Sequence, residues 1–184
     1  MKKTILLCFL VFIVSNAYAK KATSRSVEAA PTPAPENQVY FGVGTGADLP
    51  GSNWDPNYLL GGGANAFVGC RLDKNLAVQL DGEEWFFSGT GYSLYNFRIL
   101  VEGKYTFEGQ GWQPYVLIGP GLVFQSDSPA GESTSNFDAL AGLGAQFDVA
   151  PRTHFYIEAK YNFILSQSTT FTDVPVSAGL WVGL

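Results

Sequence analysis

Regular alternation of apolar and polar residues is the feature that most limits how this chain can fold. In the stretch 154–163, HFYIEAKYNF, apolar side chains occupy every second position, and the residues between them are mostly polar or charged. A period of two places the apolar side chains on one face of an extended strand. The stretch is therefore predicted to be a half-buried β-strand. The alternation alone leaves open whether its apolar face meets a protein core or lipid.

Eight segments of the chain show this alternation, and no amphipathic helix is found after residue 37. The segments span about 38–46, 62–72, 76–87, 94–107, 113–124, 136–149, 154–166 and 174–184. The connections at 47–61, 88–93, 125–135 and 167–173 are mostly long, and those at 73–75, 108–112 and 150–153 are short turns. Long loops at one end and short turns at the other are typical of transmembrane barrels. A soluble up-and-down barrel can also have eight strands, so the count alone does not decide between water and lipid.

The spacing of aromatic residues and the low charge content favour lipid. Phe97 and Phe107 lie ten residues apart on one predicted face, and so do Phe137 and Phe147. Ten residues at about 3.3 Å each, tilted by about 40°, rise about 25 Å, which matches the apolar band between two aromatic girdles. Only 15% of the residues are charged, against about 25% in soluble domains. We therefore predict an all-β fold, an eight-stranded antiparallel up-and-down transmembrane β-barrel.

The apolar faces of these strands carry the aromatic residues that are expected at the lipid interface. They are Tyr95, Phe97, Tyr105, Phe107, Phe137, Phe147, Phe155, Tyr161 and Phe163. Glu84 falls on the same face of its strand. Two features of the segment VLIGPGLVF differ from the other strands. Val116, Ile118 and Leu122 are assigned to the lumen side, and a bulge is expected at Pro120 because proline cannot donate a ladder hydrogen bond.

The beginning of the chain indicates export. Residues 1–19 combine the basic start MKK, an apolar run from Ile5 to Val14 and an A-x-A site ending at Ala19, which is typical of a cleaved signal peptide. Residues 20–37 are small, polar and proline-rich, so they are expected to form a flexible periplasmic tail before the barrel at 38–184. Cleavage leaves Cys70 as the single cysteine, which excludes an internal disulfide. The excess of acidic over basic residues argues against nucleic acid as a partner.

The polar faces carry a set of charged residues that is predicted to line the lumen. They are Arg71, Asp81, Glu83, Arg98, Glu102, Lys104, Asp138, Asp148, Glu158 and Lys160. They either pair across a closed interior or line a narrow conduit that favours cations. Counting from the hairpin SGTGYS places Glu83 opposite Arg98. A register slip of two residues would place Asp81 opposite Arg98 instead.

The predicted long loops are acidic and contain no lysine or arginine among their charged residues. Asp48, Asp55, Asp127, Glu132 and Asp173 are assigned to them. These side chains either are simply solvated or form a surface for binding and adhesion.

The sequence gives little support to catalysis or metal binding. An acyl hydrolase needs a nucleophile, a base and an orienting acid within hydrogen-bond reach, and the single histidine, His154, is predicted beside a turn. One histidine and one cysteine in the mature chain do not make a zinc site. No catalytic residue, metal ligand or cofactor is therefore assigned.

From about Gln38 to Leu184 the chain resembles the small eight-stranded outer-membrane barrels, the OmpA- and OmpX-like, porin-like group. The resemblance rests on QPYVLIGPGLVF, AGLGAQFDV, FYIEAKYNF and the closing VPVSAGLWVGL. Barrel enzymes of this class that act on lipids resemble one another in a His-x-Ser-Asn pattern. The single histidine of this chain stands instead in the sequence HFYI.

This resemblance implies a monomer in the outer membrane of a Gram-negative cell envelope. Its neighbours would be outer-membrane lipid and lipopolysaccharide. The barrel-assembly machinery would recognise the last strand, which ends here in Leu184 instead of the usual Phe or Trp. The expected function is a non-enzymatic structural role with a closed polar lumen. A narrow channel and a surface-binding module are the alternatives.

Overall fold

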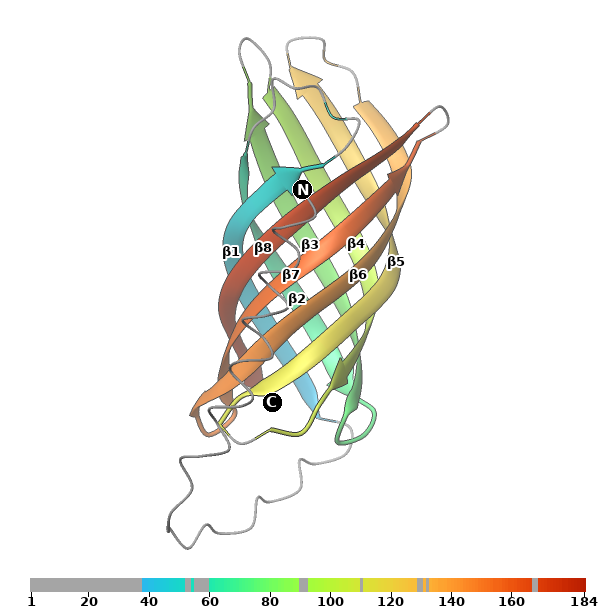
Figure 1. Cartoon of the computed structure of the whole chain (residues 1–184). Coiled ribbons are helices and arrows are strands. Elements are labelled where there is room, and N and C mark those ends of the chain that lie inside the picture. The colour runs from blue at the N-terminus through green and yellow to red at the C-terminus, as the bar shows by residue number, and fades with distance from the viewer. Residues whose placement is uncertain are drawn as a thin grey trace, which may run out of the picture. The chain divides into compact units, whose positions relative to one another are not determined.

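The computed structural model describes residues 38–51, 54, 60–89, 93–109, 111–128, 131, 133–166 and 169–184. These residues form eight antiparallel strands that close into a barrel in sequence order (Figure 1). The strands are β1 (Val39–Pro50), β2 (Gly61–Arg71), β3 (Leu76–Ser88), β4 (Ser93–Thr106), β5 (Gln113–Ser128), β6 (Ser133–Ala150), β7 (Thr153–Leu165) and β8 (Thr170–Gly183). The predicted fold is confirmed. In the described ranges no helix is long and apolar enough to cross a membrane. The predicted signal peptide and tail lie outside the described residues.

Closure of the barrel depends on the first and last strands. Tyr40 of β1 is opposite Gly69 of β2 on one side and opposite Gly183 of β8 on the other. Every strand therefore has a partner on both sides, so the ladder can satisfy its backbone N–H and C=O groups without water. We call the end with the β2–β3, β4–β5 and β6–β7 connections the turn end, and the opposite end the loop end.

The strands run further toward the loop end than predicted. β1 continues to Pro50, β5 continues to Ser128, and β8 begins already at Thr170. The loops are correspondingly shorter than expected. This extension also corrects the assignment of two acidic residues. Asp48 and Asp173 lie in strands with their side chains fully buried, not in outer loops.

The other three residues of that acidic set are placed differently. Asp127 lies near the end of β5 and is half-buried. Asp55 and Glu132 lie outside the described residues. An acidic outer surface therefore receives less support from the structure than from the sequence.

The prediction of a bulge at Pro120 is wrong. The β4–β5 pairs run up to Leu100 opposite Gly121 and resume at Gly103 opposite Ile118, which is the same register. Pro120 itself stays paired with Ala139 on the β6 side. Proline thus interrupts one ladder without shifting it, because only its own N–H is missing. The one register shift in the described ladders is at the turn end of β6, between Asp148 and Ala150.

The lumen assignment of three β5 residues is also wrong. Val116, Ile118 and Leu122 are on the outside of the barrel, and Tyr115 and Leu117 point into it. Both faces of β5 are apolar here, so the alternation carries no polar marker to identify the inner face. Tyr115 and Leu117 pack inside against Leu100 and Leu140.

The outside of the barrel is apolar. All nine aromatic residues assigned to the lipid face are exposed, and so are aliphatic residues such as Val43, Leu80 and Ile99. A continuous apolar surface of this kind is incompatible with water and suits hydrocarbon. Glu84 is exposed on this surface as predicted.

Aromatic clusters fill both ends of the interior. At the loop end Trp85, Phe87 and Leu94 are buried together, with Trp54 packed against them. At the turn end the cluster consists of Tyr40, Phe67, Ala77, Tyr156 and Trp181. The interior between these two clusters is largely polar.

Small residues on the inner face of β1 make room for this filling. A Cβ atom added at Gly44 would lie 2.6 Å from Asn65 Oδ1, too close for any real side chain. The space is used by Tyr156, whose hydroxyl donates a hydrogen bond of 3.0 Å to that same oxygen. Glycine at position 44 is therefore a packing requirement of the closed lumen.

Candidate functional site

The first part of the buried site is centred on Arg98 of β4, whose side chain is completely buried. Four carboxylates from four other strands surround its guanidinium. Asp48 and Glu83 each have an oxygen 3.4 Å from Nη1, and Asp138 has one 3.5 Å from Nε. Asp173 contacts Nη2. One cation thus connects β1, β3, β6 and β8 across the lumen.

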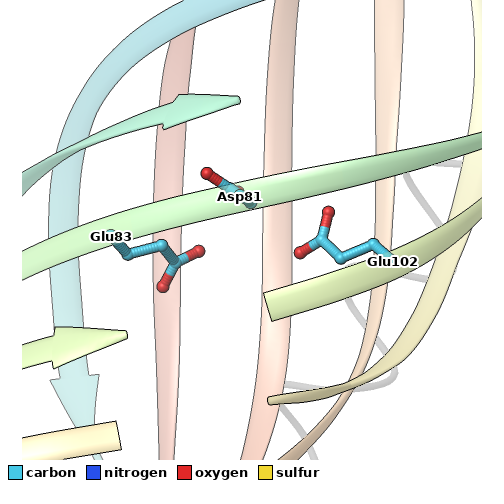
Figure 2. Close-up of side chains that lie close together, drawn as sticks. All are labelled: Asp81, Glu83 and Glu102. Atoms are coloured by element: carbon cyan, nitrogen blue, oxygen red, sulfur yellow. The ribbon is translucent and has the colours of Figure 1, made fainter. Parts of the chain in front are cut away.

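The second part is centred on Lys160 of β7, and its Nζ is held by carboxylates from the opposite wall. Nζ lies 2.6 Å from Asp81, 2.8 Å from Glu83 and 2.6 Å from Glu102. Glu158 of the same strand is 3.3 Å away. Figure 2 shows Asp81 and Glu83 on one strand and Glu102 on the next, with their carboxylates close together.

The three carboxylates have the ligand set of a divalent cation site, but the ammonium group of Lys160 already occupies the space between them. One oxygen from each of Asp81, Glu83 and Glu102 lies within 4.8 Å of the others, as ligands of one ion would. The ammonium group of Lys160 donates to all three. Because an ammonium has three N–H donors, these contacts use all of them. We call these four residues the ammonium cage.

Glu83 joins the two parts. Its Oε1 accepts from Lys160, and its Oε2 accepts from Arg98 at 3.4 Å and from the Trp85 indole at 2.9 Å. Among the described residues, seven carboxylates therefore contact two cations, since Glu83 belongs to both groups. The predicted opposition of Glu83 and Arg98 is confirmed by the register.

Neutral polar side chains extend the network in both directions. Gln79 donates to Glu102 at 2.5 Å and accepts from the Tyr40 hydroxyl at 3.0 Å. Toward the loop end Asn162 donates to Asp173 at 2.9 Å. A fully buried network of this kind can fix the relative positions of strands, because an unpaired group in a dry interior is costly.

Most of the predicted lumen charges lie in the interior. Asp81, Glu83, Arg98, Glu102, Lys104, Asp138, Glu158 and Lys160 are buried. Arg71 is half-buried at the turn end. Asp148 is not buried in the lumen: it is exposed at the turn end of β6, where its carboxylate lies 2.6 Å from His154 Nδ1.

The sequence reasoning missed the acids at the loop end, although a signal for one of them was available. Tyr40, Gly42, Gly44 and Gly46 all point inward, and continuing this alternation by one step reaches Asp48. Glycines hide the alternation because they give no apolar or polar marker. No comparable signal marks the ammonium cage, because Lys160 comes from β7, which neighbours neither β3 nor β4.

Comparisons with known proteins agree with this architecture. Residues 4–180 match the sequence model of a family described as the outer membrane protein beta-barrel domain. No curated protein sequence matches the chain.

Several solved structures are similar. Neisserial surface protein A is 18% identical with a TM-score of 0.69, covering 78% of this chain and 96% of that one. The N-terminal β-barrel domain of Pseudomonas aeruginosa OprF is 14% identical with a TM-score of 0.56, covering 81% and 98%. Ail, the attachment invasion locus protein of Yersinia pestis, is 18% identical with a TM-score of 0.53, covering 80% and 99%. At these identities the likeness establishes a common fold.

Proposed function

The chain belongs to the outer membrane protein β-barrel domain family, and from this premise we propose that it is a closed-lumen, non-enzymatic structural protein of the outer membrane. In this proposal residues 1–19 are a cleaved signal peptide and residues 20–37 a periplasmic tail. Residues 38–184 are the barrel, with its loop end facing outside. Outer-membrane lipid and lipopolysaccharide surround the monomeric barrel, and the assembly machinery recognises the last strand.

The observation that carries the proposal is the filled interior. Arg98 and Lys160 are each surrounded by carboxylates at the middle of the barrel, and their side chains are at most 2% exposed. Aromatic clusters close both ends. An eight-stranded barrel has just enough internal space for its side chains, so a conducting path would require these groups to separate.

A structural role also fits the environment of the single histidine. The His154 ring stacks on Trp181 with 3.8 Å between ring centroids and an interplanar angle of 14°. Its Nδ1 faces the Asp148 carboxylate. One ring face and one nitrogen are thus occupied by rim packing, which supports the assignment of His154 as a structural residue.

Envelope integrity after gene deletion tests the proposal. Deletion is expected to increase sensitivity to detergents and large hydrophobic antibiotics, and the wild-type gene should restore resistance. His154→Ala should restore it equally, because no catalysis is involved. A variant with residues 51–60 shortened should also restore it. Failure of the shortened variant alone would favour a surface-binding function, and failure of His154→Ala with a normally folded barrel would favour an enzyme.

A further inference from the structure

Two cations at the turn end of the lumen have no carboxylate partner in the described part of the chain. Lys104 of β4 is 6% exposed, and Arg71 ends β2. Among the described residues, neither cation has a carboxylate oxygen within 4.0 Å. Lys104 Nζ instead donates to Gln146 Oε1 at 3.0 Å and lies 3.9 Å from the centre of the Tyr115 ring. A charge buried in a protein is normally paired with an opposite charge.

The surrounding acids are already engaged by other groups. Glu102 and Glu158, which act on Lys104 electrostatically, both contact the Lys160 ammonium. Asp148, which acts on Arg71, is held at 2.6 Å by His154. The excess of carboxylates in the middle of the barrel therefore does not supply a direct partner at its turn end.

Between the two cations lies a small cavity, which we call the mouth cavity. Its volume of about 10 Å³ is room for a single water-sized particle. It is lined by Tyr40, Arg71, Ala77, Lys104, Thr106, Gln146 and Trp181.

An unsatisfied donor provides a second, independent indication of a ligand. Trp181 is 2% exposed, and within the described part of the chain its indole N–H has no hydrogen-bond acceptor. Indole is a donor only, as are lysine and arginine. Arg71 lies over the same indole, with Cζ 5.3 Å from the ring centre. The cavity thus brings together three N–H donor groups and two positive charges.

We infer that the mouth cavity binds a small inorganic monoanion of the size of chloride. Such an ion accepts hydrogen bonds from all three donor types and neutralises part of the charge on Arg71 and Lys104. The small size of the cavity favours a monatomic anion over the larger sulfate and phosphate ions. A water molecule would leave both cations without a counter-ion. The site is independent of the proposed closed lumen, because it lies at the turn end and not in the central network.

Chloride-35 NMR on the purified full-length protein in detergent micelles tests this inference. Exchange of chloride with a protein site should broaden the bulk signal, and bromide should remove the excess width in a saturable manner. Arg71→Gln and Trp181→Phe are each expected to weaken binding about tenfold, the loss typical of one charge-assisted or buried hydrogen bond. Lys74→Gln is the matched control, because Lys74 is an exposed cation at the same end, paired with Glu108.

Each outcome bears on the site. Saturable broadening that is lost in Arg71→Gln and Trp181→Phe and retained in Lys74→Gln supports it. Equal broadening in all variants would place chloride elsewhere. Broadening that bromide does not compete away would not come from a saturable site, which leaves water alone in the cavity. Both results overturn the inference. Heat-dependent gel mobility verifies folding of each variant. Arg71→Gln keeps the test valid even if a variant at a more buried position does not fold, because Arg71 is only half-buried.

Discussion

Glu83 on β3 lies directly opposite Arg98 on β4, and its carboxylate contacts both buried cations of the barrel. Oε2 lies 3.4 Å from Arg98 Nη1, and Oε1 lies 2.8 Å from Lys160 Nζ. Glu83 is therefore shared, so the pair cannot be treated in isolation. Asp48, Asp138 and Asp173 also hold Arg98.

Replacement of Arg98 should destabilise the barrel strongly. Arg98→Met preserves much of the side-chain volume but leaves Asp48, Asp138 and Asp173 without a cation, while Glu83 keeps its contact with Lys160. Breaking a buried ionic group in this way typically costs about 3–5 kcal/mol in the free energy of unfolding. Adding Glu83→Gln should recover only part of the loss, because three acids remain and Lys160 also loses a charged partner. Urea unfolding followed by tryptophan fluorescence measures both variants, and a change below about 1 kcal/mol for Arg98→Met would contradict the network.

Removal of the caged lysine should convert the ammonium cage into a cation site. Lys160→Ala leaves Asp81, Glu83 and Glu102 with oxygens that already lie within 4.8 Å of each other. Calcium binds oxygen ligands at about 2.3–2.6 Å, so one ion can reach all three. We expect Lys160→Ala to be less stable than wild type and to gain thermal stability when it is refolded with Ca²⁺. Wild type should show no such gain.

The matched control for this prediction is Lys160→Ala combined with Asp81→Asn, which removes one anionic ligand. It should respond to Ca²⁺ less than the single variant does. An equal response of wild type and Lys160→Ala would mean that the ion acts elsewhere on the protein.

The β2–β3 turn should make the stability depend on acid pH. The backbone N–H groups of Asn75 and Leu76 both donate to Asp73 Oδ1 at 2.7 Å and hold the pKa of this exposed carboxyl below its ordinary value. A lowered folded-state pKa gives stability that is present above the unfolded pKa of about 3.9 and is lost as the pH falls through the folded pKa. The difference in melting temperature between wild type and Asp73→Ala should thus be present at neutral pH and shrink in acid. A difference that grows in acid would refute this assignment.

Orientation in the membrane can be tested by labelling on intact cells. Ser128→Cys at the loop end should react with a membrane-impermeant maleimide, and Lys74→Cys at the turn end should react only after lysis. Both substitutions belong in a Cys70→Ser background, since Cys70 is a free thiol. Labelling of Lys74→Cys alone on intact cells would reverse the proposed topology.

The sequence was sufficient for those parts of the fold that depend on neighbouring strands. Alternation located all eight strands, and the short connection after Ser88 fixed the register that brings Glu83 to Arg98. Where the local signal is ambiguous, the prediction failed. Both faces of β5 around Leu117 are apolar, so its inner face could not be recognised, and the expected bulge at Pro120 is absent from a ladder that continues in register.

Contacts across the lumen could not be predicted from local patterns. Lys160 of β7 meets Asp81 of β3, and these two strands lie on opposite sides of the ring. Their distance depends on the closure of the whole barrel and on the side chains that fill it. The alternation weakens before Pro175 and so predicts a loop at Asp173, whereas the strand begins at Thr170 and buries the carboxylate.

Conductance of the purified protein in a planar lipid bilayer tests the closed lumen most directly. Insertion of the folded barrel is verified by heat-dependent gel mobility of the same sample, and a general porin in the same bilayer is the positive control. With Arg98 and Lys160 held by carboxylates and both ends closed by aromatic clusters, we predict no discrete current steps from the wild-type protein. Reproducible ohmic steps from inserted wild-type barrels would contradict the closed lumen and identify the protein as a channel.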